Sequence, residues 1–284
     1  MATKASRLTS GFIGFLFALA ASAADSVNDT QESAFSFALV PQQAASKLLQ
    51  SWGPVLSYLN IHTGHHFAFR TAPDIPTFEN RLRSEDYDFA YMNPYHFTIF
   101  NQGDTGYQAV AKARDKLIRG VIVVRKDSPI QALGELDGLT LAFPAPAAFA
   151  ASVLPRANLN ARNIEFEAKY VSSHDSVYRA VAKGLYPAGG GVVRTLNATE
   201  PTIREQLRVL WMTQGYTPHA IAAHPRVPAD IVAAVREALA MMSDDEAGRA
   251  ALKRLKVKGF EAAANADWDD VRQLNITTVV GSKD

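Results

Sequence analysis

Strand-like and helix-like segments alternate along most of this chain, and the alternation limits the folds it can adopt. The apolar residues of 35–39 recur with a period of two, and those of 46–60 recur at helical spacing. The strand-like runs at 87–92, 136–143 and 165–171 are each followed by a helical pattern. Strands that alternate with helices predict an α/β protein whose mostly parallel sheets carry helices on both faces.

The same pattern predicts how two lobes would be connected. No repeat or flexible linker divides the chain, so the connections would have to be ordinary strands. We expect the chain to cross between lobes near 112–119 and again near 211–219. The first lobe is then formed by 34–115 and 216–284, and the second lobe by 116–215.

Prolines predict where helices begin or change direction. Gly53 and Pro54 predict a kink or a restart inside the helix at 46–60, and Pro155 is expected to disturb the helix that starts near residue 147. From Pro228 onward the pattern is mostly helical.

The first 23 residues are expected to form a cleavable signal peptide. Lys4 and Arg7 precede an apolar run at 11–21, and the small-x-small sequence Ala-Ser-Ala ends at Ala23. A retained anchor is the weaker alternative, because the run is shorter than a membrane span. The chain has 0 cysteines, so its core would be stable without disulfides after export to the periplasm.

The charge balance excludes one class of partner. There are 29 Lys and Arg residues against 28 Asp and Glu, so the whole chain offers no basic field for nucleic acid. Any anion would have to be bound locally.

Polar side chains stand where two strands end and helices begin. Asn93 and Tyr95 follow one strand, and Ser172, Ser173 and His174 follow another. Ligands of open α/β sheets bind at this edge, because the N–H groups of a helix start are unpaired there and attract anions.

Four segments together resemble the periplasmic solute-binding proteins of phosphate, phosphite and phosphonate ABC transporters. The resemblance runs from about Phe35 to about Leu239 and has no single decisive motif. The four segments, in chain order, are LVPQQAASKLLQSW, FAYMNPYHF, VIVVRKDSPIQALGELDGLTLAF and SHDSVYRAVAKG. The resemblance implies a type 2 periplasmic binding protein, with two lobes that close on a ligand.

The resemblance also implies ligand contacts. Tyr91, Asn93 and Tyr95 would line the pocket from the first lobe, and Ser173 and His174 would contact the oxyanion from the second. Alternatively, the ring of His174 only packs beside a helix cap. The next two residues, Asp175 and Ser176, are expected to cap the following helix.

The chain departs from the family pattern at a second helix start. Relatives carry Ser and Thr hydroxyls at the positions of Ala147, Ala148 and Phe149, and here those hydroxyls are absent. The hypothesis is that main-chain N–H groups at this turn bind the ligand, with a contribution from Ser152 one turn later.

Another departure concerns the tail of the ligand. Where amine-binding relatives carry acidic residues, this chain has Arg194 and, further on, His219. This change disfavours a ligand with an ammonium arm and favours an anionic or hydrogen-bonding tail. Alternatively, Arg194 is a solvated residue at a helix start.

The resulting prediction is a non-catalytic protein that captures a small oxyanion or polar solute and delivers it to an ABC permease in the inner membrane. The alternative is a periplasmic sensor subunit that docks on a histidine kinase or another receptor. No paired nucleophile and base or GxxxxGK loop is present, so no enzyme activity and no cofactor are expected. The histidines of 62–66 are too tightly spaced to predict a metal site.

Overall fold

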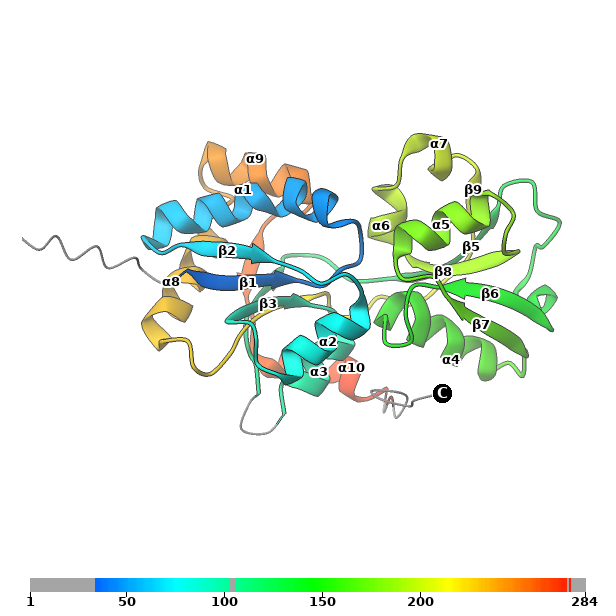
Figure 1. Cartoon of the computed structure of the whole chain (residues 1–284), viewed down its shortest axis with the longest axis horizontal. Coiled ribbons are helices and arrows are strands. Elements are labelled where there is room, and N and C mark those ends of the chain that lie inside the picture. Colours follow the sequence, from blue (N-terminus) through cyan, green and yellow to red (C-terminus); the bar gives the residue numbers. More distant parts are fainter. Residues whose placement is uncertain (1–33, 103–105, 275, 277–284) are drawn as a thin grey trace, which may run out of the picture. The chain divides into compact units, whose positions relative to one another are not determined.

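The computed structural model describes residues 34–102, 106–274 and 276, and its first sheet is built around β1 (Figure 1). β1 (Phe35–Leu39) lies between two parallel neighbours, β2 and β3. On the far side of β3 the remaining strands, β10, β4 and β11, are antiparallel to their neighbours. The bounds of these five strands are β2 Phe67–Arg70, β3 Phe89–Met92, β4 Gln108–Ala113, β10 Ala220–Ala223 and β11 Phe260–Ala262.

The second sheet is formed by the middle of the chain. Its strands lie in the order β7-β6-β8-β5-β9, with β6 parallel to β7 and β8, and β5 antiparallel to β8 and β9. The bounds are β5 Gly120–Arg125, β6 Leu139–Phe143, β7 Phe166–Tyr170, β8 Ala188–Val192 and β9 Leu207–Met212.

Both sheets are therefore mixed, and the expectation of mostly parallel sheets is wrong in this respect. The α/β class is confirmed, but β10 and β11 were missed. β10 is the fully buried apolar run Ala-Ile-Ala-Ala, which has no alternation, and β11 contains only three residues in a region with a mainly helical pattern. Pairing with distant strands gives them their extended conformation.

Helices cover both faces of the first sheet (Figure 1). Along β1, Phe37 and Leu39 pack with α1, α8 and α9, whereas Ala38 and Val40 lie in the other core, with α2, α3 and α10. Alternate strand residues thus supply two separate cores. The helices are α1 Ala45–Thr63, α2 Ile75–Arg83, α3 Pro94–Phe100, α8 Ala229–Met241, α9 Glu246–Leu255 and α10 Asp269–Arg272.

The second sheet is covered in the same way. Val121 and Val123 of β5 pack with α5 (His174–Ala182), whereas Ile122 and Val124 lie in the core that includes Leu159 of α4 (Leu154–Asn160). Two short helices, α6 (Val193–Asn197) and α7 (Pro201–Arg204), follow β8.

Pro54 and Pro155 affect their helical segments differently. α1 continues without a break through Pro54. Around Pro155 the helical segment is irregular, as expected, because regular α-helix begins only at Leu154 and Pro155 lies in its first turn. The π-helical turn η2 (Phe149–Val153) leads directly into α4.

Two glycines allow η2 to approach the second sheet closely. A Cβ atom on Gly190 would lie 1.9 Å from the carbonyl oxygen of Ala151, and one on Gly120 would lie 2.0 Å from that of Ala150. These contacts are far shorter than van der Waals distance, so glycine at both positions determines where η2 lies.

The chain passes between the sheets twice. Residues 114–119 connect β4 to β5, and residues 213–219 connect β9 to β10. The two segments are paired to each other through an antiparallel bridge between Ile118 and Tyr216. The predicted signal peptide lies outside the described residues, and none of the described helices is long and apolar enough to cross a membrane.

Candidate ligand-binding cleft

Residues from both sheets meet at a small cavity, which we call the cleft cavity. Its volume is about 10 Å³, room for about one water molecule. The first sheet contributes the loop after β1 and the start of α3, and the second contributes η2, the end of β8 and the start of α5. The lining residues are Val40, Gln42, Ile75, Asn93, Ile118, Ala148, Phe149, Ala150, Ala151, His174, Val192 and His219.

Gln42 connects the two sides of the cleft cavity. Its side-chain oxygen accepts a hydrogen bond from Arg194 Nη2 at 2.9 Å, and its main-chain oxygen accepts one from the His174 N–H at 3.3 Å. Its side-chain nitrogen contacts His219 Nε2. Donors from the second sheet therefore converge on oxygens supplied by the first.

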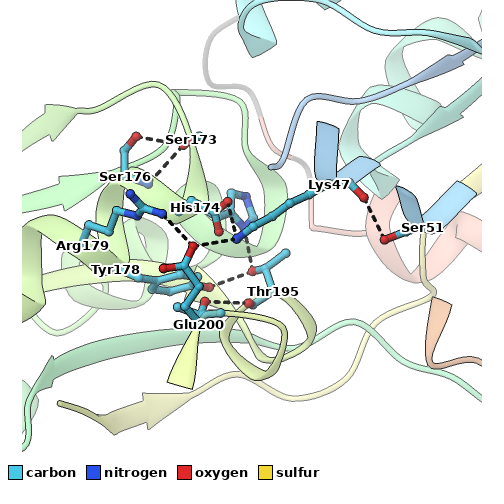
Figure 2. A network of polar contacts seen from close by, with 11 residues as sticks. Lys47, Ser51, Ser173, His174, Ser176, Tyr178, Arg179, Thr195 and Glu200 are labelled. Atoms are coloured by element: carbon cyan, nitrogen blue, oxygen red, sulfur yellow. Dashed lines mark hydrogen bonds and ion pairs between the residues drawn. The ribbon is translucent and has the colours of Figure 1, made fainter. Parts of the chain in front are cut away.

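His174 is the first residue of α5, and its side chain is buried beside the cavity. Its Nδ1 lies 2.9 Å from Thr195 Oγ1, which also contacts the Tyr178 hydroxyl at 2.8 Å (Figure 2). Burial, and secondly the charge of Arg194, lowers the pKa of His174 to about 3. The imidazole is therefore neutral at physiological pH and offers a hydrogen bond rather than a charge.

Arg194 and His219 lie together with Tyr91. The rings of Tyr91 and His219 are stacked with centroids 4.9 Å apart, and all three side chains line a larger neighbouring cavity. Burial and the charge of Arg194 lower the pKa of His219 well below its ordinary value. Arg194 thus supplies the fixed positive charge here.

The side chain of Asn93 forms hydrogen bonds within the protein. Its Oδ1 accepts a hydrogen bond from the His96 N–H at 2.8 Å and so caps α3, while its Nδ2 donates to the Ala147 carbonyl at 3.3 Å. Tyr95, in the same helix, is 4% exposed and belongs to the apolar core on that side. Asn93 lines the cleft cavity, and Tyr95 does not.

The turn at 147–149 is only partly available to a ligand. Its N-cap, Ala148, has no side-chain hydrogen bond, but the Ala148 N–H donates to the Ala145 carbonyl at 3.2 Å. That amide closes an internal turn here, so ligand binding by the N–H groups of this turn stays a prediction. Phe149 is buried edge-on to Tyr216, and Ser152 is buried with no partner for its hydroxyl among the described residues.

Ser173 is the N-cap of α5. Its hydroxyl oxygen accepts the Ser176 N–H at 3.1 Å, a role that the sequence assigned to Asp175 and Ser176. Asp175 instead forms an ion pair with Lys47 of α1, with 3.4 Å between Nζ and Oδ2. Lys47 also lies 3.9 Å from Glu200, so it is a further connection between α1 and the second sheet.

Sequence reasoning missed Gln42, Lys47 and Thr195. Gln42 lies inside the segment LVPQQAASKLLQSW, directly after a strand that ends at a proline, which is the same kind of position as Asn93. This position after a strand could have identified Gln42 as a candidate site residue. No sequence signal identifies Thr195 or Lys47, because their partners, His174 and Asp175, lie 21 and 128 residues away.

The chain matches a protein-family model over residues 37–268, which is most of its length. The model is described as the periplasmic substrate-binding protein of phosphonate ABC transporters. Such a protein is a binding component and not an enzyme.

Solved structures have the same fold. A binding protein component of an ABC phosphonate transporter from Pseudomonas aeruginosa has a TM-score of 0.77 at 17% identity, covering 85% of both chains. PhnD1 of Prochlorococcus marinus, solved with methylphosphonate, has a TM-score of 0.76 at 17% identity, covering 85% of this chain and 98% of PhnD1. A Xanthomonas citri protein, solved with ATP, has a TM-score of 0.64 at 18% identity over 85% of this chain and 98% of that one.

These structures confirm the expected fold of a type 2 periplasmic binding protein. The chain belongs to the family of periplasmic substrate-binding proteins of phosphonate ABC transporters.

Proposed function

We propose that the protein captures a small oxyanion, such as a phosphonate, phosphite or phosphate, between its two sheets and delivers it to an ABC permease in the inner membrane. The observation that carries the proposal is the hydrogen bonding of Gln42. Its side-chain oxygen accepts a hydrogen bond from the Arg194 guanidinium, and its main-chain oxygen accepts one from the first N–H of α5. A guanidinium and a helix N-terminus are the donors that bind an oxyanion.

The charges around the cleft cavity favour a ligand without an ammonium arm. His174 and His219 are neutral because burial lowers the pKa of each imidazole, so Arg194 is the charged residue in the cluster around Gln42. A positive amine near Arg194 would be repelled. The methylphosphonate in the Prochlorococcus structure, an anion with an apolar tail, supports this ligand class.

The size of the cleft cavity implies that the ligand displaces part of the protein. A volume of about 10 Å³ does not hold a phosphonate. The side chain of Gln42 occupies the donors that the ligand needs, so binding requires Gln42 to withdraw and the sheets to separate and close again. Hinge closure around a ligand is how binding proteins of this architecture work.

Sensing is a second candidate function. The turn at 147–149 lacks side-chain hydroxyls, and Gln42 fills the cleft in the absence of ligand. Weak binding suits a subunit that reports a solute to a histidine kinase or another receptor. The genes next to this one distinguish the two functions, since a permease and an ATPase support uptake, whereas a kinase supports sensing. In neither case do we infer enzyme activity, and incubation with phosphate esters should give no turnover.

Calorimetry with methylphosphonate, phosphite, phosphate and acetate tests the proposal. A tight ligand at 100 times its Kd should also stabilise the protein by about 2.7 kcal/mol. The Arg194→Gln variant should lose about 1.5–3 kcal/mol of binding free energy. Arg162→Gln is the matched control, because Arg162 is exposed and contacts Asn158 in its own segment. The proposal is wrong if Arg194→Gln binds as tightly as the control.

A further inference from the structure

A second, much larger cavity lies beside the cleft cavity, and we call it the basic pocket. Its volume is about 620 Å³, within the range of about 300–1,000 Å³ that is typical of small-molecule sites. Its walls come from both segments that connect the sheets, from the start of α6 and from the loop after α9. It lies at the point where the chain passes between the two sheets.

Several of the side chains that line the basic pocket are positively charged. The whole chain is nearly neutral at +1, so this is a local concentration of charge. Asp115 is the acidic residue among the lining residues. The cationic lining residues are Arg114, Lys116, Arg119, Arg194, Lys256 and Lys258.

Neutral groups, rather than carboxylates, bind most of these cations. Lys116 Nζ donates a hydrogen bond to the Lys256 carbonyl at 2.6 Å. Lys256 Nζ donates one to the Asn197 carbonyl at 3.3 Å. Within the described part of the chain, the pocket contains one ion pair, a 3.8 Å contact between Lys258 and Asp115, whose side chains are 77% and 66% exposed. An exposed pair at that distance neutralises little of the charge.

The effect of this uncompensated charge is visible at Lys116. Burial is the largest cause that lowers the pKa of its ammonium group, and the charges of Arg194 and Lys256 lower it further. Bringing a multiply charged anion among these groups would relieve their mutual repulsion.

We propose that the basic pocket binds a small molecule that carries a diphosphate-type group. The number of cations is far above what a single phosphonate needs, and the cleft cavity already offers donors for such an ion. Apolar residues, among them Tyr91, Val192 and Val193, also line the pocket, and an organic part of the ligand can pack on them. The basic pocket adjoins the cleft cavity and shares Ile118, Val192 and His219 with it. Its other cations, Arg194 apart, lie outside the cluster around Gln42.

Calorimetry in 0.15 M NaCl tests the proposal with sodium pyrophosphate, ADP, phosphate and methylphosphonate as separate probes. Pyrophosphate should bind at least tenfold more tightly than phosphate. Its affinity should fall at least tenfold in Lys256→Asn/Lys258→Gln, two exposed residues whose loss removes two charges. Asn is chosen because residue 256 has a φ of 55°, which Asn tolerates.

Lys126→Gln/Lys183→Gln is the matched control, since both lysines are exposed and outside the basic pocket. It should bind pyrophosphate within twofold of the unmodified protein. ADP that binds as tightly as pyrophosphate would show that the site accepts an organic part, and much weaker ADP binding would identify the inorganic ion. If Lys256→Asn/Lys258→Gln has a lower unfolding midpoint than the unmodified protein, the single variant Lys258→Glu is used in its place. It should also weaken pyrophosphate binding.

The proposal is overturned if pyrophosphate binds no more tightly than phosphate, or if the pocket variants and the control bind it equally. Methylphosphonate separates this result from the function proposed for the cleft. Its binding should be unchanged in the pocket variant. If the protein binds pyrophosphate but no oxyanion in the cleft, the basic pocket stands and the transport proposal fails.

Discussion

The side-chain oxygen of Gln42 accepts a hydrogen bond from Arg194 Nη2 at 2.9 Å, although the two residues are 152 positions apart in the chain. The contact joins the loop after β1 to the start of α6, and so joins the two sheets. Gln42 thus occupies the guanidinium that the function proposed above assigns to a bound oxyanion. On that proposal, the ligand and the side chain of Gln42 compete for the same donors.

Gln42→Ala should raise the affinity for methylphosphonate by about tenfold or more. A hydrogen bond to a charged group contributes about 1.5 kcal/mol or more, and removing it from the ligand-free state removes the competitor. Titration calorimetry measures the change. Gln43→Ala, a partly exposed neighbour, should leave the affinity unchanged. A lower affinity in Gln42→Ala would mean that Gln42 contacts the ligand instead.

Stability should fall with acid because of His174. Burial lowers the pKa of His174 to about 3 in the folded protein, against 6.5 for an ordinary histidine. Below pH 6.5 the unfolded chain binds a proton that the folded protein does not, so the free energy of unfolding falls as the pH drops toward 3. At pH 4.5 this one residue accounts for a loss of about 2–3 kcal/mol relative to pH 7.

Urea denaturation at pH 7 and pH 4.5 measures this loss. His174→Gln should show a loss smaller by about 2–3 kcal/mol, because glutamine does not titrate. The exposed His66 provides the control, and His66→Gln should keep the full pH dependence. Equal pH dependence in His174→Gln and the unmodified protein would contradict the buried, neutral state of His174.

Gly190→Ala should destabilise the protein by about 1–3 kcal/mol or more. The new methyl group would lie 1.9 Å from the Ala151 carbonyl oxygen and 2.7 Å from the Phe143 ring, so η2 would have to move. Gly134→Ala is the control, because no atom lies within 4 Å of its added Cβ, and the change should stay within about 0.5 kcal/mol. Thermal unfolding compares the two. Similar midpoints would show that η2 does not pack against β8 in this way.

Lys47→Gln should lower the free energy of unfolding by about 1 kcal/mol or less at low salt. The ion pair with Asp175 is 3.4 Å long, but the Lys47 side chain is 31% exposed and water screens the pair. In 1 M NaCl the difference should disappear. Lys169→Gln, which breaks an exposed pair within β7, should have no measurable effect. A large, salt-independent loss in Lys47→Gln would show that the pair is effectively buried.

Much of the fold could be predicted because its signals are local. The apolar period of two marked β1, and the polar residues after strands marked the starts of α3 and α5. The role of Ser173 was harder to predict, because any of several neighbouring polar residues can cap a helix. The strand β11 could not be found, because three residues carry no periodicity and only pairing with β4 makes them extended.

The sequence by itself determined the α/β class, the family and the stretches of chain from which the cleft is built, because these depend on patterns that neighbouring residues form with one another. Only the tertiary structure decided that Gln42 occupies the donors of the cleft and that His174 is neutral. It also decided that six cations line one pocket of a nearly neutral chain. Burial and distance determine those properties, and both arise from contacts between residues far apart in the sequence.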